Sequence, residues 1–140
     1  RAAFAGFDPE RMARYGEAER ARLLADPGIV RNRLKVDAFV TNARAWLALR
    51  DAGVDFADLV WRHAPTPRAA AARPRRLADL PVSTPESDAL SKALAKAGFK
   101  FVGTTIAYAF MQAAGLVDDH VADCWRAAPA TPPGAHRPGA

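Results

Sequence analysis

The sequence predicts an all-α fold. Half of the 140 residues are apolar, and alanine, the strongest helix former, supplies much of that share. Apolar residues recur at helical spacing along residues 31–52, whereas no segment convincingly shows the alternation of a half-buried strand. The length suffices for one hydrophobic core. We therefore expect one helical body over residues 1–126, followed by a disordered tail over residues 127–140, which are rich in Pro, Ala and Gly.

Three helices are predicted in the N-terminal part of the chain. The first spans residues 8–15, because Asp8 can cap a helix and proline is tolerated at the first helical position. The second spans residues 17–25 and ends before an Asp-Pro-Gly break. The third, over residues 31–52, carries the longest periodic signal, and Gly53 is its expected stop. Its apolar stripe consists of Val36, Phe39, Val40, Ala43 and Leu47.

Four more helices are predicted after Gly53, separated by an irregular arm over residues 64–82 that is rich in proline and arginine. The fourth helix is capped by Asp55, the fifth begins at Thr84-Pro85, and the seventh is capped by Asp118 or Asp119. Their expected spans are residues 55–63, 84–97, 104–114 and 118–126.

Charge and cysteine content limit the class of protein. The net charge of +5 permits a polyanionic partner without proving one. The single cysteine, Cys124, excludes an intramolecular disulfide and fits a reducing cytoplasm. No apolar run approaches the roughly 18 residues that span a bilayer, so we expect a soluble cytoplasmic monomer. Because the chain opens on Arg1 and not on Met, we also expect that upstream residues are missing.

Two glycines, Gly98 and Gly103, bracket a tight turn between two predicted helices. The start of the second helix presents backbone N–H groups and the positive end of the helix dipole, which together suit a phosphate. Lys100 and the hydroxyls of Thr104 and Thr105 would add contacts to it. The alternative is an ordinary helical hairpin with a glycine C-cap, and spacing alone favours this alternative.

His120 and Cys124 are spaced so that, on one helix, an imidazole and a thiolate face the same side. This arrangement suits half of a tetrahedral zinc site. Two ligands do not complete such a site, and His63 and His136 lie in unpromising contexts. Spacing alone therefore favours a chance pairing.

Three further features have both a functional and a structural interpretation. Asp118 and Asp119 are either helix caps, or a general base or stabiliser of a cationic sugar. The arginine-rich stretch at residues 62–76 either lies along a phosphate backbone or is a solvated loop. Trp46 and Trp61 are expected in the core rather than as stacking platforms.

A long, specific pattern extends from Thr84 to Cys124, and shorter matching runs precede it. This pattern resembles the DNA-3-methyladenine glycosylase I family, and the resemblance covers residues 1 to about 126. The runs that carry it are FDP at 7–9, GIVR at 28–31, NARA at 42–45, SDALSKAL at 87–94, GFKFVGTTIAYAFMQAAGLV at 98–117, DDH at 118–120, and Cys124.

The resemblance implies a helix-hairpin-helix enzyme of base-excision repair that removes 3-methyladenine from alkylated double-stranded DNA. Such enzymes flip the damaged nucleotide out of the duplex and cut its N-glycosidic bond. The hairpin at residues 98–105 would hold the DNA backbone, and His120 and Cys124 would be the last two ligands of a structural zinc ion. The wider superfamily has a catalytic aspartate at a position that resembles Asp118, although members of this family often lack it.

The family's N-terminal region is absent from this chain. By resemblance, that region holds the first two zinc ligands, the aromatic residues that stack on the base and a glutamate that reads it. We therefore expect residues 1–140 alone to be inactive or nearly so. One alternative is a truncated, non-catalytic DNA-binding helix-hairpin-helix module. Another is a helical interaction protein whose hairpin binds no nucleic acid.

Overall fold

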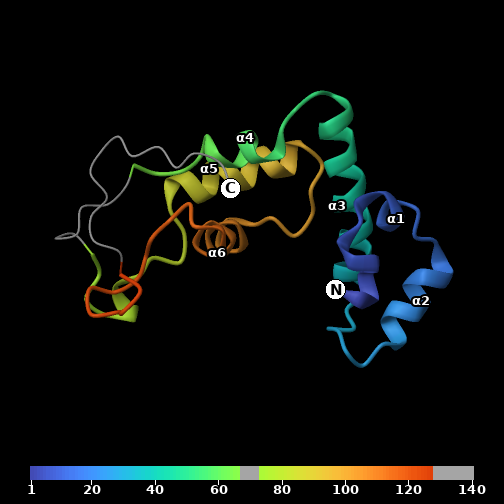
Figure 1. The fold of residues 1–140 in the computed structure, drawn as a ribbon, viewed down its shortest axis with the longest axis horizontal. Helices are drawn as coiled ribbons and strands as arrows, with labels where there is room; N and C mark the ends of the chain where they lie inside the picture. The colour runs from blue at the N-terminus through green and yellow to red at the C-terminus, as the bar shows by residue number, and fades with distance from the viewer. Residues whose placement is uncertain (67–72, 128–140) are drawn as a thin grey trace.

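The computed structural model describes residues 1–66 and 73–127, and within these residues every regular element is helical. This confirms the predicted all-α class. The expected tail, apart from Ala127, lies outside the described residues. The elements are η1 (Ala2–Phe7), α1 (Pro9–Ala13), α2 (Glu17–Ala25), α3 (Arg33–Asp51), α4 (Phe56–Trp61), η3 (Leu77–Asp79), α5 (Pro85–Lys96) and α6 (Thr104–Ala114) (Figure 1).

Side-chain caps set most of the helix starts. The predicted caps Asp8 and Asp55 accept backbone N–H groups of the first turns of α1 and α4, and Thr84, where the fifth helix was expected to begin, does the same for α5. At the start of α3, Asn32 accepts the Lys35 N–H at 3.0 Å, a cap that the sequence prediction missed. For these four helices, the predicted starts lie within two residues of the observed ones.

The long helix α3 lies between two apolar clusters. The N-terminal cluster, formed with η1, α1 and α2, contains Phe4, Met12, Leu23, Val36 and Ala43. The C-terminal cluster contains Ala45, Val60, Leu90, Leu94, Phe99, Ala107, Met111 and Leu116. In Figure 1, α3 runs across the direction of α5 at the junction of these two halves. Because α3 contributes to both clusters, it connects them.

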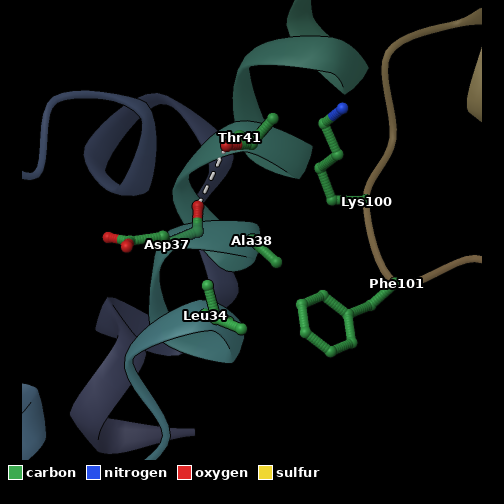
Figure 2. A pocket seen from close by; sticks show the side chains of 6 residues that line it. All are labelled: Leu34, Asp37, Ala38, Thr41, Lys100 and Phe101. Atoms are coloured by element: carbon green, nitrogen blue, oxygen red, sulfur yellow. Dashed lines mark hydrogen bonds between the residues drawn. The ribbon is translucent and has the colours of Figure 1, made fainter.

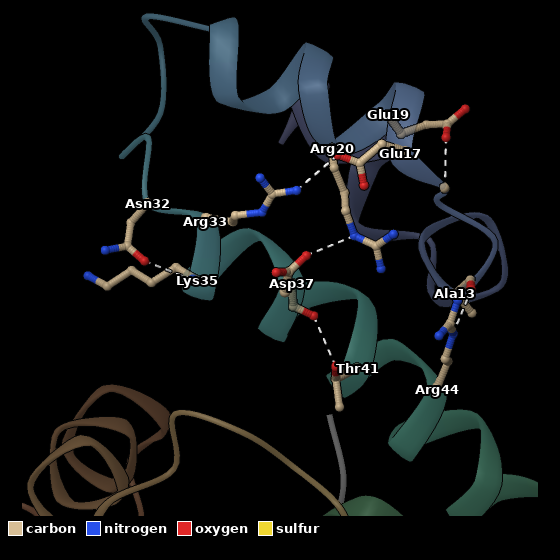
Figure 3. Close-up of polar contacts among 11 residues, drawn as sticks. Ala13, Glu17, Glu19, Arg20, Asn32, Arg33, Lys35, Asp37, Thr41 and Arg44 are labelled. Carbon is tan, nitrogen blue, oxygen red and sulfur yellow. Dashed lines mark hydrogen bonds and ion pairs between the residues drawn. The ribbon is translucent and has the colours of Figure 1, made fainter.

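The buried surface of α3 is wider than the single predicted stripe. Val36, Val40 and Ala43 are buried as expected, but Phe39 remains 39% exposed. Ala38 and Ala45 are buried instead, because α3 is covered on more than one side. Polar contacts reinforce the N-terminal side: Figure 3 shows the ion pairs that join α2 to α3, between Arg20 and Asp37 (2.8 Å) and between Arg33 and Glu17 (2.9 Å).

Two other predictions were wrong. Trp61, expected in the core, is 53% exposed, because it is the last residue of the short helix α4 and only Val60 of that helix is buried. The helix expected over residues 118–126 does not form, and the chain there is irregular apart from turns at 122–123 and 125–126. Its carboxylates bond to groups elsewhere in the protein instead of capping a helix.

The described parts of the predicted arm, residues 64–66 and 73–82, are irregular apart from the short helix η3, as expected. Across the described ranges, none of the helices combines the length and the apolar character that a membrane crossing requires.

Candidate functional site

Helices α5 and α6 form a hairpin joined by residues 97–103. The turn begins at Gly98, whose φ of +94° is a conformation that residues with a Cβ rarely adopt. The Phe99 N–H donates to the Leu94 carbonyl and the Gly98 N–H to the Ala95 carbonyl, both at 3.0 Å. These two bonds form a Schellman motif, and Phe99 packs into the same cluster as Leu94. The end of α5 is therefore fixed by both backbone bonds and apolar burial.

The start of α6 is open. Gly103 is its N-cap and supplies no side-chain hydrogen bond, so the cap satisfies none of the first backbone N–H groups of the helix. A Cβ built on Gly103 would meet no atom within 4 Å, and its φ of −56° suits any residue. The fold therefore does not require glycine at this position, and the space in front of α6 is free for a ligand.

The three side chains predicted to assist this helix start lie differently. Lys100 and Thr105 are exposed, as a ligand contact requires. The Thr104 hydroxyl lies 2.9 Å from Oγ of the fully buried Ser87, between α5 and α6. Thr104 therefore contributes its hydroxyl to helix packing, and its backbone N–H is the group that faces the start of the helix.

The hairpin loop is also bonded to α3. The Asn42 side chain accepts the Lys100 backbone N–H at 2.7 Å and donates to the Lys100 carbonyl at 3.0 Å. Next to this pair, a cleft of about 310 Å³ separates α3 from the loop (Figure 2). The ring of Phe101 faces Leu34 and Ala38 across it. The complete lining is Leu34, Asp37, Ala38, Thr41, Lys100 and Phe101.

Asp118, the predicted catalytic candidate, is held by an arginine of the arm. Its two oxygens accept from Nη1 and Nη2 of Arg73 at 2.9 and 2.5 Å, and the Arg73 side chain is only 8% exposed. The hydrogen bonds from Arg73 hold the pKa of Asp118 below its usual range, against a smaller opposing effect of burial. Asp118 is therefore ionised at neutral pH and already has a partner.

This ion pair predicts a pH-dependent stability. Because the folded-state pKa of Asp118 lies below the unfolded value of about 3.9, the pair stabilises the fold above that pH, and this contribution is lost as the pH falls through the folded pKa. Asp118→Asn is expected to lower Tm at pH 7, and the difference from wild type should shrink below about pH 4. Asp123→Asn, at an exposed acid of the same segment, is the control. Thermal melts across pH measure both, and a pH-independent difference for Asp118→Asn would contradict the ion-pair account.

Asp119 is directed the opposite way, into the protein. It is only 8% exposed and accepts hydrogen bonds from the Tyr108 hydroxyl and, at 3.0 Å, from the Gln112 amide. Both donors lie on α6, so Asp119 attaches the C-terminal segment to that helix. Sequence analysis offered Asp119 as a helix cap, a general base or a stabiliser of a cationic sugar, and it did not predict the bond to Tyr108. An acid two residues after an apolar Leu-Val pair was the available signal for burial.

His120 and Cys124 lie together although no helix holds them. The Cys124 sulfur is 3.6 Å from His120 Nδ1, and a backbone bond from the Cys124 N–H to the Val121 carbonyl (2.9 Å) closes the intervening turn. Two ligands of a tetrahedral zinc ion, with Zn–S of about 2.3 Å and Zn–N of about 2.0–2.1 Å, would lie about 3.6 Å apart. The donor pair therefore fits zinc in both chemistry and spacing. Among residues 1–66 and 73–127, no cluster of three or more His, Cys, Asp or Glu is placed to hold a metal ion.

Known proteins match this chain over most of its length. Residues 1–127 match the family model described as methyladenine glycosylase. The chain is 50% identical over 127 residues to DNA-3-methyladenine glycosylase 1 of Escherichia coli (strain K12), and 42% identical over 127 residues to DNA-3-methyladenine glycosylase of Haemophilus influenzae (strain ATCC 51907 / DSM 11121 / KW20 / Rd). Each match covers 89% of this chain and 66% of the relative, so the chain spans just under two-thirds of their length.

Solved structures share the fold. A crystal structure of 3-methyladenine DNA glycosylase I superposes with a TM-score of 0.84 at 51% identity, covering 90% of this chain and 69% of the other. A variant of 3-methyladenine DNA glycosylase I in complex with 3-methyladenine gives a TM-score of 0.82 at 30% identity, covering 93% and 69%. The sequence match and the shared fold extend over the same helices, so the chain belongs to the methyladenine glycosylase family.

Proposed function

We propose that the protein is a DNA N-glycosylase that excises 3-methyladenine from alkylated double-stranded DNA in base-excision repair, acting as a cytoplasmic monomer. The family match along residues 1–127 carries the proposal. Two relatives named as DNA-3-methyladenine glycosylases and a related structure bound to 3-methyladenine support this substrate.

The α5–α6 hairpin would be the helix-hairpin-helix motif that binds the DNA backbone. Its support is the open start of α6, where backbone N–H groups and the helix dipole face a space that no Cβ fills. Lys100 adds a positive charge and Thr105 a hydroxyl, both exposed. Since phosphates carry no base identity, this site would fix position on the duplex and leave base recognition to another part of the protein.

The proposed chemistry requires little acid catalysis. A 3-methylated adenine is cationic and already a good leaving group, so recognition and a shaped, partly dry pocket supply most of the acceleration. The catalytic role of Asp118 stays a prediction. Its pairing with Arg73 keeps it ionised, which suits stabilisation of a cationic sugar better than proton abstraction.

We also propose that His120 and Cys124 are two ligands of a structural zinc ion. The support is their donor chemistry and the 3.6 Å separation of Sγ and Nδ1. A closed shell of four protein ligands leaves no position for water, so the ion would cross-link the fold and take no part in the reaction. The other two ligands would come from outside the described residues, which by family resemblance means the N-terminal region.

The second candidate is a DNA-binding module without catalysis. The observation in its favour is the complete α5–α6 hairpin with the open start of α6. Such a module would bind duplex DNA through the same hairpin and release no base.

Release of 3-methyladenine from methylated duplex DNA tests the proposal. The complete gene product is expected to release free 3-methyladenine, which chromatography detects, and residues 1–140 alone are expected to release little or none. Duplex binding without base release by the complete gene product would favour the non-catalytic module. Turnover by residues 1–140 comparable to a full-length relative would instead move recognition and catalysis onto residues of this chain.

A further inference from the structure

The contact between Asn42 and Lys100 joins positions 58 residues apart. It pairs a side-chain amide with both polar groups of one peptide backbone residue, as a neighbouring strand would. The two bonds also fix the orientation of the amide, because the reversed assignment would place donor against donor and acceptor against acceptor. Among side chains as short as that of residue 42, only asparagine carries both an N–H donor and a carbonyl acceptor on one amide.

The loop that Asn42 holds is conformationally demanding. Phe101, the residue after Lys100, has a φ of +55°, which is uncommon for a bulky side chain and persists only where surrounding contacts enforce it. Two residues later, Gly103 begins α6 without any side-chain cap. The conformation of residues 100–103 is therefore not determined by local preference.

Helix α3 supplies the external support for this loop. One helical turn after Asn42, Ala45 packs in the C-terminal cluster, and its Cβ would lie 3.7 Å from a Cβ on Gly98. The same face of α3 thus lies close to the start of the turn at Ala45 and bonds to the middle of the loop through the Asn42 amide. Figure 2 shows the loop running alongside α3 at this point.

From this geometry we propose that Asn42 is a positioning residue for DNA binding: it keeps the hairpin loop in the one conformation that presents the start of α6 to a phosphate. The inference rests on the proposed DNA-binding function. Asn42 itself need not contact DNA. Its contribution is preorganisation, since the apparent dissociation constant rises in inverse proportion to the fraction of molecules in the competent conformation.

The experiment compares two alanine variants on the same helix. Asn42→Ala removes both bonds to Lys100. Asn32→Ala removes the N-cap bond of α3 to Lys35 and leaves the hairpin loop untouched, so it serves as a stability control. Duplex affinity is measured at several salt concentrations, together with Tm and with hydrogen exchange of the Lys100 amide.

For Asn42→Ala we expect duplex affinity to fall by about tenfold. This is the loss expected if the hairpin loop adopts its DNA-binding conformation in about one-tenth of the molecules. The slope of log affinity against log salt should be unchanged, because the same phosphate contacts form once the loop is in place. The Lys100 amide should exchange faster. Asn32→Ala should lower Tm but keep wild-type affinity and Lys100 protection.

The inference is overturned if Asn42→Ala binds as tightly as Asn32→Ala, or if the Lys100 amide stays equally protected in it. If the wild-type protein itself binds no duplex, the proposed DNA-binding function is wrong, and the inference about Asn42 is wrong with it. This outcome is distinguishable from the others because it appears in the wild type and not only in the variant.

Discussion

Cys124→Ser is expected to remove zinc from the complete gene product. The wild-type protein should hold one zinc ion per chain, and the variant should hold none. Serine keeps the size of the side chain but cannot supply a thiolate, the donor that zinc prefers in structural sites. Because structural zinc binding is coupled to folding and contributes on the order of 10 kcal/mol in small zinc domains, Tm should also fall strongly.

Elemental analysis of the purified proteins measures this directly. His120→Ala should behave like Cys124→Ser, whereas His63→Ala, at an imidazole elsewhere in the chain, should keep its zinc. A complete gene product that purifies without zinc, or a Cys124→Ser variant that retains it, would show that His120 and Cys124 are not a ligand pair.

The proximity of His120 and Cys124 was predicted from a helix that does not form. The sequence placed His120 and Cys124 on one helix, where a spacing of four residues brings side chains together. The structure brings them within 3.6 Å by a turn instead. Asp118 and Asp119 do not cap a helix here, because Arg73, Tyr108 and Gln112 bond to their carboxylates.

Local chemistry accounts for the parts of the fold that were predicted well. Caps and glycine stops mark α3, α4, α5 and α6, and the bounds of α2 and α6 match the predicted ranges. The hairpin was recognisable because Gly98 and Gly103 lie within one short segment.

The missed features depend on contacts between distant segments. Arg73 and Asp118 are 45 residues apart, and Asn42 and Lys100 are 58 apart. Helical periodicity reports which face of a helix is buried but not which polar side chain meets which backbone group. The exposure of Trp61 was missed for the same reason. Whether the last residue of a short helix is buried depends on how the helix packs against distant segments.

Gly103→Val is expected to weaken duplex binding by tenfold or more. A valine at the start of α6 would occupy the space that a phosphate needs, whereas the slope of log affinity against log salt should stay the same, because the substitution removes no cationic side chain. The fold should be unaffected, since a Cβ there meets no atom within 4 Å and the backbone conformation suits any residue. Ala114→Val adds the same side chain at the far, exposed end of α6 and is the matched control.

The measurement that tests the hairpin account most directly is the duplex affinity of wild type, Gly103→Val and Ala114→Val between about 50 and 200 mM salt. The account predicts that wild type and Ala114→Val lose affinity steeply as salt rises. It predicts that Gly103→Val binds more weakly at every salt concentration with an unchanged slope, and to a similar extent on duplexes of different sequence. A correctly folded Gly103→Val protein that binds like wild type, or a wild-type affinity that does not change with salt, would contradict it.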